Sequence, residues 1–436
     1  MHKIIIALFA LLLTAGCFRE KHKSDYILPQ LEDIVIYQIN PRVFAENNSF
    51  NSIVLRIDSI KQLGANIIWL MPIYEIGQVK SINSPYCVKD YKSVNPELGT
   101  LNDFKNLISV CHQQNIGVII DWVPNHTSWD HVWMSNKDWY SQDSLGNIIS
   151  PPGTGWNDVA DLNFDNQEMR LAMIDAMKYW VTEAGVDGFR CDAVDFVPAD
   201  FLQQANDSLR NIPDKKLLLL AEGMRKDHFD SGFDLNYAWE FHNRMRDVYR
   251  NDSCASLLFT ANDDEYKDIP IGKRKLRFST NHDEAAKESP IQEWINERGS
   301  MSAFATILFF PGCPMIYSSQ EVGYPFPINF FTHTQIDWSS NFKLKKEYEN
   351  LLSIYNNYEV LRKGELKAYP DENILLFERI SGYDKYLVVI NVRNSEQKIK
   401  LPEDIANRPF KNLYTKRNLS LSEVLTLQPY EYLILK

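Results

Sequence analysis

Short, unbroken runs of apolar residues recur along most of the chain, and stretches with helical spacing lie between them. A strand that is buried on both faces reads as a continuous apolar run, as in a parallel α/β sheet. The runs therefore predict buried strands near 34–39, 66–71, 116–121, 186–191, 216–222, 232–235, 274–280 and 314–318.

Helical periodicity is clearest in Ser52–Leu63, Leu101–Gln114 and Gln167–Glu183. The last of these carries methionine and aromatic side chains along one side, which indicates core packing and not a ligand site. A segment rich in Trp, Asp, Gly and Pro interrupts the alternation at 127–161, and a loop of that length in a compact domain is usually functional. From about residue 363 the pattern changes to short strands separated by turn residues, which predicts a terminal β-sandwich.

Several of the predicted strands end in ionisable residues, which is typical of a (β/α)8 barrel with its site at the carboxyl ends of the strands. These residues are Asp121, Asn125, His126, Arg190, Asp192, Glu222 and Asp283. Arg190 precedes Asp192 by two positions, so both side chains lie on one face of the strand. We expect the guanidinium to keep the Asp192 carboxylate ionised, which suits a nucleophile, although buried arginine–aspartate pairs also serve purely structural roles.

Four segments resemble, in this order, the signature regions of the α-amylase family of glycoside hydrolases: DWVPNH (Asp121–His126), GFRCDA (Gly188–Ala193), AEG (Ala221–Gly223) and STNHD (Ser279–Asp283). One such motif is weak, but the ordered set is specific, and the resemblance covers roughly 33–436. It implies a (β/α)8 barrel over 33–362, with a short domain B at 127–161 after the third strand and a C-terminal antiparallel β-sandwich at 363–436.

The resemblance also implies roles for individual residues in a retaining hydrolase. Asp192 is expected to be the nucleophile, Glu222 the acid/base, and Asp283 the third catalytic carboxylate. Glu222 has no charged neighbour in sequence and follows an apolar strand, which agrees with a carboxyl that stays protonated until it is needed. The expected substrate-binding residues are Tyr86, His126, Arg190 and His282, while Asp121 is expected to support the site structurally.

A structural calcium ion is implied less strongly. Asn125 and Asp161 match positions that ligate calcium in many relatives, and oxygen ligands suit this cation. Those relatives often carry Lys-His after the nucleophile segment, where this chain has Asp195-Phe196. The alternative is that Asn125 and Asp161 are simply solvated or hydrogen-bonded, and the missing lysine puts the usual contact with the leaving sugar in doubt.

Composition narrows the choice of partners. The 436-residue chain has a net charge of −11 and no basic run, which argues against nucleic acid or an anionic membrane surface as a partner. No phosphate loop is evident, and we expect no organic cofactor. Apart from Cys17 there are five cysteines, an odd number, so free buried thiols are expected and not a disulfide framework.

The first residues have the pattern of a signal peptide: a short basic start, an apolar run from Ile4 to Leu13, and then Leu13-Thr14-Ala15-Gly16-Cys17. The run is too short to span a bilayer. The LTAGC ending resembles a bacterial lipoprotein signal, which implies a signal peptide at 1–16, lipidation of Cys17, and a tether at 17–32. We therefore expect a protein that is lipid-anchored in the bacterial cell envelope, on either the periplasmic or the surface face of the outer membrane. The alternatives for this segment are an ordinary cleaved signal peptide or a buried helix.

The expected activity is hydrolysis of α-1,4-glucosidic bonds in starch-type glucans or maltooligosaccharides. An exo-acting α-glucosidase or a transglycosylase of the same family remains an alternative. A glycan-binding protein without activity is disfavoured because all three carboxylates are present. The sequence does not indicate the oligomeric state.

Overall fold

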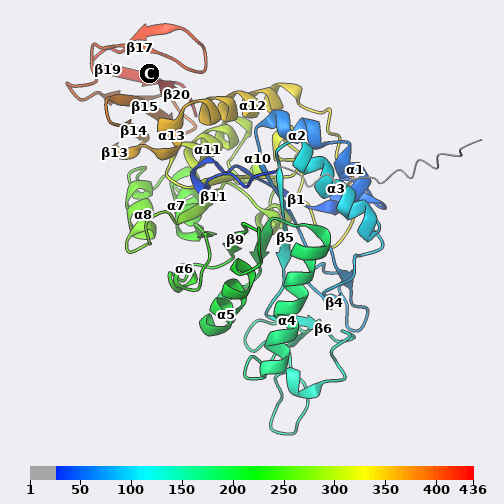
Figure 1. Ribbon diagram of the computed structural model, residues 1–436. Coiled ribbons are helices and arrows are strands. Elements are labelled where there is room, and N and C mark those ends of the chain that lie inside the picture. The colour runs from blue at the N-terminus through cyan, green and yellow to red at the C-terminus, as the bar shows by residue number, and fades with distance from the viewer. Residues whose placement is uncertain (1–25) are drawn as a thin grey trace, which may run out of the picture.

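The computed structural model describes residues 26–436, and its central element is a closed barrel of parallel strands (Figure 1). The barrel strands are β1 (Ile36–Ile39), β2 (Ile67–Leu70), β5 (Gly117–Trp122), β8 (Gly188–Cys191), β9 (Leu218–Ala221), β10 (Leu235–Tyr237), β11 (Arg274–Phe278) and β12 (Cys313–Tyr317). Their order around the barrel is β1-β12-β11-β10-β9-β8-β5-β2. The predicted barrel is thus confirmed. The predicted signal peptide, including Cys17, lies outside the described residues.

The observed strands follow the apolar runs closely, with one clear shift. The sequence pattern predicts a strand at 232–235, whereas β10 begins at Leu235. Phe233 is fully buried but belongs to the turn before the strand. Its hydrophobicity therefore misplaces the predicted start.

Alternate side chains of each barrel strand point into the barrel and towards the surrounding helices. Ile36, Trp69 and Leu220 belong to the buried cluster inside the barrel. Tyr37 and Ile68, each next in sequence to one of these, belong to the larger cluster between strands and helices. Because both faces are buried, the strands read as unbroken apolar runs.

Helices surround the barrel and connect its strands. They are α1 (Ser49–Val54), α2 (Ile57–Leu63), α3 (Leu101–Gln113), α4 (Gln167–Tyr179), α5 (Ala199–Arg210), α6 (Asp227–Asp230), α7 (Trp239–Arg250), α8 (Leu257–Tyr266), α9 (His282–Lys287), α10 (Pro290–Glu293), α11 (Glu297–Phe309), α12 (Phe342–Asn357) and α13 (Glu359–Lys363).

Two of the helix predictions need correction. The segment predicted as one helix at Ser52–Leu63 forms α1 and α2, separated by a turn at 55–56; α1 packs against α3, whereas α2 packs against α12. The helix predicted to reach Glu183 ends as α4 at Tyr179 and continues as a π-helical turn at Trp180–Ala184. Gly185 closes that turn with a left-handed φ of 83°.

A small lobe projects from the barrel and carries β4 and β6 (Figure 1). Its short strands are β3 (Glu75–Ile76), β4 (Val88–Asp90), β6 (His126–Ser128) and β7 (Val159–Asp161). β3 pairs with β4 and β6 pairs with β7, both antiparallel. The β6–β7 pair joins the two ends of the insertion that follows β5.

The C-terminal part is built from antiparallel strands on the far side of the barrel from this lobe (Figure 1). One sheet contains β13 (Glu365–Tyr369), β14 (Ile374–Ser381), β15 (Asp384–Asn391) and β20 (Tyr432–Leu435), and two smaller sheets contain β16 (Gln397–Lys400) with β19 (Val424–Leu427) and β17 (Pro409–Lys411) with β18 (Asn418–Ser420). Phe377 and Val388 belong to the main core, whereas Leu376 and Val389 belong to a separate core with residues of the smaller sheets. The larger sheet therefore has one face in each core, as a β-sandwich arrangement requires.

All five cysteines of the described residues are free, as the odd count predicted. None of the helices described for this chain is long and apolar enough to cross a membrane.

Candidate active site

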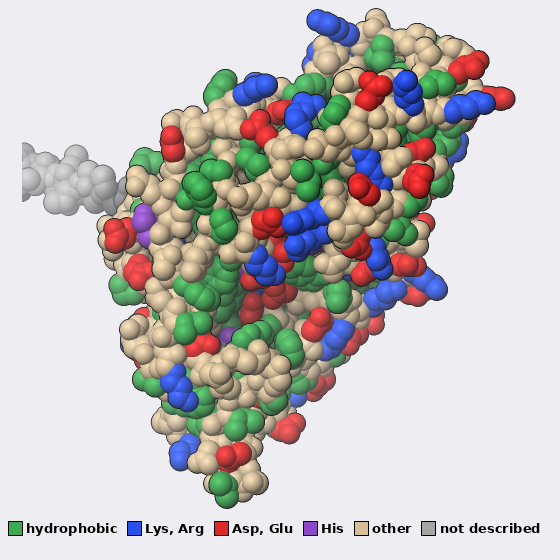
Figure 2. All heavy atoms as spheres, turned by 180° about the vertical axis from the view of Figure 1, so that it is seen from behind, with side chains coloured by type: hydrophobic (Ala, Val, Ile, Leu, Met, Phe, Trp, Pro, Cys, Tyr) green, Lys and Arg blue, Asp and Glu red, His purple; other side chains and the backbone are tan. Residues whose placement is uncertain are grey.

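Polar side chains from several barrel strands meet around a cavity of about 230 Å³. Asp192 follows β8, Glu222 follows β9, and His282 and Asp283 begin α9 after β11; all four line this cavity. Figure 2 shows a hollow on one face of the molecule, with acidic side chains at its base and hydrophobic side chains around it. The barrel thus brings together three carboxylates that are far apart in the sequence.

Arg190, which is fully buried, lies at the centre of these carboxylates. Its Nη1 donates to Oδ1 of Asp121 and to Oδ1 of Asp192, each at 2.8 Å. Its Nη2 lies 2.6 Å from Oε1 of Glu222, and its Nε donates to the Tyr237 hydroxyl at 3.2 Å. The contact predicted between Arg190 and Asp192 is present. Glu222, which has no charged neighbour in sequence, gains one in the structure because β8 and β9 are adjacent in the barrel.

Both carboxylate oxygens of Glu222 have a polar partner, Oε1 through an ion pair and Oε2 through a hydrogen bond. In addition to the contact of Oε1 with Arg190, Oε2 accepts the backbone N–H of Ala193 at 2.7 Å. Two nitrogens of one guanidinium therefore hold Asp192 and Glu222 side by side at the base of the cavity.

Three carboxylates share one guanidinium here, so the site has excess negative charge when all of them are ionised. Burial raises the pKa of Asp121 to about 7, although Arg190 opposes the rise. Burial, and then the charge of Glu222, raise the pKa of Asp192 well above its usual range, again against Arg190. Arg190 therefore lowers the pKa of Asp192 as expected, but desolvation and the second carboxylate outweigh the guanidinium, so the net shift is upward.

Tyr86 and His282 form a hydrogen-bonded pair beside this charged centre. The amide Nε2 of Gln38 lies 2.8 Å from Nδ1 of His282, which makes Nδ1 an acceptor and leaves the proton on Nε2. That Nε2 lies 2.7 Å from the Tyr86 hydroxyl, which in turn donates to Oδ2 of Asp121 at 3.2 Å. Burial, followed by the nearby Arg190 charge, lowers the pKa of His282 to about 3, so this imidazole is neutral.

Asp283 is fixed by the start of α9. The side chain of Asn281 accepts the backbone N–H groups of Asp283 and Glu284 at 3.0 and 2.9 Å. Burial raises the pKa of Asp283, and its carboxylate reaches the cavity.

The lobe inserted after β5 supplies another wall of the cavity. His126, in β6, lines it, and burial lowers the pKa of His126 to about 4. The ring of Trp156 meets that of His126 edge-on at 5.4 Å and that of Phe196 at 5.7 Å.

Sequence reasoning missed three aromatic residues of the cavity. Trp156 comes from the inserted lobe, and Phe330 and Phe331 come from the loop after β12. Phe330 meets the His282 ring edge-on at 5.3 Å. The only sequence signal was their position in aromatic-rich loops, and such loops do not reveal which way a ring points.

The two candidate calcium ligands lie in the inserted lobe. Asn125 is buried and its Nδ2 lies 3.3 Å from Nδ1 of His126, which leaves its carbonyl oxygen as a donor for a cation. Burial raises the pKa of Asp161, and no ion pair joins Asp161 to a basic side chain in the part of the chain that the structure describes. An oxygen-only pair containing a half-buried, uncompensated carboxylate fits the chemistry of a hard cation.

Comparison with known proteins agrees with this geometry. The model of the alpha-amylase catalytic domain matches residues 38–146 and 154–346, well over half of the chain. The chain belongs to the α-amylase family. Alpha-amylase 3 of Dictyoglomus thermophilum is 24% identical, over 94% of each chain. The crystal structure of a maltogenic alpha-amylase from Thermotoga neapolitana is 26% identical and superposes with a TM-score of 0.84, covering 93% of this chain and 99% of that one.

Membership of this family makes the protein a glycoside hydrolase. The matched region contains nearly all of the barrel, the inserted lobe except 147–153, and every polar residue of the cavity described above. A pair of close carboxylates is the machinery that glycoside hydrolysis requires, since one protonates the leaving oxygen and the other attacks the sugar.

Proposed function

We propose that this α-amylase-family enzyme cleaves α-1,4-glucosidic bonds of starch-type glucans or maltooligosaccharides with retention of configuration. The observation that carries the proposal is the position of Asp192 and Glu222, which contact Nη1 and Nη2 of the same Arg190 guanidinium. Retaining enzymes hold their carboxyls roughly 5–5.5 Å apart and inverting enzymes roughly 6.5–9.5 Å apart. One planar guanidinium that binds both carboxylates favours the shorter separation. The names of the relatives, two alpha-amylases among them, support α-glucans as the substrate class.

In the first step Asp192 attacks the anomeric carbon while Glu222 gives its proton to the glycosidic oxygen, so the leaving sugar departs as an alcohol. In the second step Glu222 takes a proton from water, which attacks the same carbon and releases Asp192. The first step requires Asp192 as the carboxylate and a proton on Glu222, and Arg190 contacts both groups. Two displacements at one carbon return the α-anomer.

We assign binding roles to the remaining cavity residues. Asp283 reaches the cavity from the start of α9 and is placed to accept sugar hydroxyls. Tyr86 offers an aromatic face, and the neutral imidazole of His126 can donate to hydroxyls without adding charge, while His282 donates to the Tyr86 hydroxyl and lines the cavity with its ring. Asp121 is fully buried behind them and acts through Arg190 and Tyr86.

A second candidate, exo-action on chain ends, is favoured by the size of the cavity. Its volume of about 230 Å³ is below the roughly 300–1,000 Å³ of a typical ligand pocket. Asp195, which stands where relatives carry a lysine, turns its carboxylate to His228 at 3.2 Å and accepts the Met224 N–H at 3.2 Å, so it does not replace a cationic contact with a leaving sugar. Product analysis on amylose, pullulan, cyclodextrin and maltotriose separates the two modes: internal cleavage gives mixed oligosaccharides from amylose, whereas exo-action releases one short product.

Calcium binding at Asn125 and Asp161 is part of the proposal. These residues would hold the ion with help from backbone carbonyls, and the ion would fix the inserted lobe. EDTA should lower the melting temperature of the wild type, calcium should restore it, and Asp161→Asn should abolish the difference. A wild-type melting temperature that is unchanged by EDTA and by calcium rules out the calcium site.

We also propose a lipid anchor on Cys17 that holds the enzyme at the bacterial cell envelope, on the outer membrane. The LTAGC sequence supports it. The anchor would keep the enzyme where polymeric glucans or their fragments are available.

The catalytic assignment is tested with Asp192→Asn and Glu222→Gln, each compared with the exposed Glu168→Gln as a control. Both active-site variants should fold and lose orders of magnitude in kcat/KM. Either variant keeping more than about a tenth of the wild-type value contradicts the assignment. NMR before mutarotation should show α-anomeric product first, and initial release of the β-anomer would overturn the retaining mechanism.

A further inference from the structure

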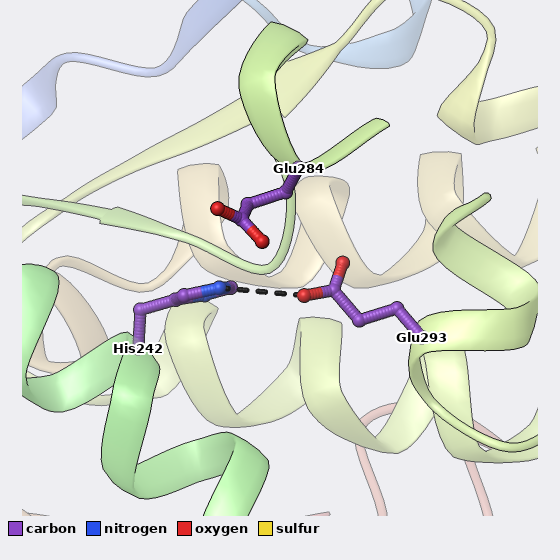
Figure 3. A group of neighbouring side chains, drawn as sticks. All are labelled: His242, Glu284 and Glu293. Atoms are coloured by element: carbon purple, nitrogen blue, oxygen red, sulfur yellow. Dashed lines mark ion pairs between the residues drawn. The ribbon is translucent and has the colours of Figure 1, made fainter. Parts of the chain in front are cut away.

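Outside the substrate cavity, three buried side chains converge behind the start of α9 (Figure 3). His242 comes from α7, Glu284 from α9 and Glu293 from α10, and one ligand atom of each lies within 4.8 Å of the other two. The exposed fractions of the three residues are 1%, 6% and 1%. Water therefore does not solvate these groups freely.

The orientation of His242 is that of a metal ligand. Its Nδ1 lies 3.4 Å from the carbonyl oxygen of Phe278, which can only accept, so Nδ1 carries a proton. In the neutral ring this leaves a lone pair on Nε2, and Nε2 lies 3.3 Å from Oε1 of Glu293 without an aligned hydrogen bond. A cation between Nε2 and Oε1 would give each of these two atoms a partner, and neither has a hydrogen bond among the described residues. Metal-bound histidines usually donate their other ring N–H to a backbone carbonyl or a carboxylate in this way.

Glu293 gives a second, independent indication. Neither of its carboxylate oxygens has a hydrogen-bond partner among the described residues, although the side chain is 1% exposed. A buried carboxylate without donors costs a great deal of free energy unless a positive charge compensates it. The guanidinium of Arg246 approaches Glu293 only to 3.9 Å.

The basic side chains that now neutralise Glu284 could be displaced by a metal cation. Arg246 donates to Oε2 of Glu284 at 2.9 Å and Lys287 donates to Oε1 at 2.9 Å. Both basic side chains reach solvent, with exposed fractions of 36% and 67%, so they can turn outward. On one side the cluster is closed by aromatic rings, since His242 stacks on Phe278 at 4.9 Å.

We propose that His242, Glu284 and Glu293 bind a divalent cation of the zinc type, with water as the fourth ligand. One imidazole and two carboxylates suit Zn²⁺, Co²⁺ or Ni²⁺ and not Ca²⁺, which prefers oxygen alone. Bonds of roughly 2.0–2.2 Å place tetrahedral ligand atoms roughly 3.3–3.6 Å apart. The His242–Glu293 distance of 3.3 Å already meets this requirement, and Glu284 has to move inward to complete the site.

Such a site would act on structure and not on the reaction. It would tie α7, α9 and α10 together immediately after Asp283, and so hold that carboxylate at the cavity. The proposal does not depend on the substrate assigned above.

The test uses Co²⁺ as the probe on the full-length protein after EDTA treatment and dialysis. The wild type should bind one equivalent of Co²⁺ with d–d absorption of a nitrogen- and oxygen-ligated ion, and Zn²⁺ should displace it. Glu293→Gln should weaken binding by at least about 100-fold, because losing a ligand costs no less than losing an outer-shell partner. Glu288→Gln, at the other end of α9 and paired with Arg250, is the matched control and should bind like the wild type.

A second variant tests the competition between the Arg246 guanidinium and the metal ion for Glu284, without removing a metal ligand. Arg246→Gln should strengthen Co²⁺ binding, because it removes the cation that now neutralises Glu284. A purely structural ion-pair network predicts the opposite pattern: no stoichiometric Co²⁺ binding by the wild type, and no gain in Co²⁺ binding by Arg246→Gln. Either result, or Co²⁺ binding that survives Glu293→Gln unchanged, overturns the proposal.

Discussion

Replacing Arg190 with methionine tests the electrostatic account of the site most directly. The guanidinium is fully buried, and the side chains of Asp121, Asp192 and Glu222 that it contacts are only 0%, 12% and 16% exposed. Methionine keeps an apolar stem of similar length but leaves these carboxylates without a cation.

The expected loss of stability is about 3–5 kcal/mol near pH 8, the cost of breaking a buried ion pair by removing one partner. The loss should shrink as the pH falls. Arg190 lowers the pKa of Asp121 and of Asp192 in the wild type, so its removal raises both further above the unfolded value of about 3.9. At a pH between the unfolded and the folded pKa of these carboxyls, the folded variant binds more protons than its unfolded chain. The free energy of unfolding of the variant therefore rises as the pH falls through the folded pKa values.

Urea unfolding of both proteins from pH 5 to pH 8 measures this difference. Arg379→Met is the matched control, because Arg379 is also buried but donates only to backbone carbonyls of Phe309, Gly364 and Arg362. We expect a destabilisation that depends on pH for Arg190→Met and one that is flat with pH for Arg379→Met. A stability deficit of Arg190→Met that is the same at pH 5 and pH 8 would refute the reasoning.

Three further predictions follow from individual positions. Gly188→Ala should prevent correct folding, because a Cβ at this position would lie 1.9 Å from the Leu218 carbonyl oxygen. The matched control Gly153→Ala places its Cβ in open space and should remain soluble. A soluble, active Gly188→Ala protein would contradict the packing of β8 on β9. Trp156→Ala should raise KM with little change in kcat, measured on maltooligosaccharides, since the ring only walls the cavity; a selective loss of kcat would give it another role. Cys17→Ala should move the protein from the membrane fraction to the soluble fraction or block its processing, and unchanged fractionation with an unlipidated mature terminus would exclude the anchor.

Much of the fold follows from the sequence because its signals are local. A strand buried on both faces must be apolar at successive positions, so the barrel strands can be located from their runs. Period-two alternation alone places Asp192, just after β8, on the same face of the chain as Arg190 in β8, and their contact at 2.8 Å is present. The order of the four motifs likewise predicts the family.

Other features depend on which elements become neighbours. No local pattern tells that α1 and α2 pack on different helices, so the break between them cannot be predicted. Trp156 and Phe330 reach the cavity only because the inserted lobe and the loop after β12 fold over the same end of the barrel.

The electrostatics of the site were decided by the tertiary structure. In the sequence Glu222 has no charged neighbour, but the adjacency of β8 and β9 puts it 2.6 Å from Arg190. In the same way His242 and Glu293 meet only because α7 and α10 pack together behind Asp283. The sequence by itself determined which residue types were available and on which strand they lay. Distance and burial fix the strength of a charge interaction, and both exist only once the barrel has closed.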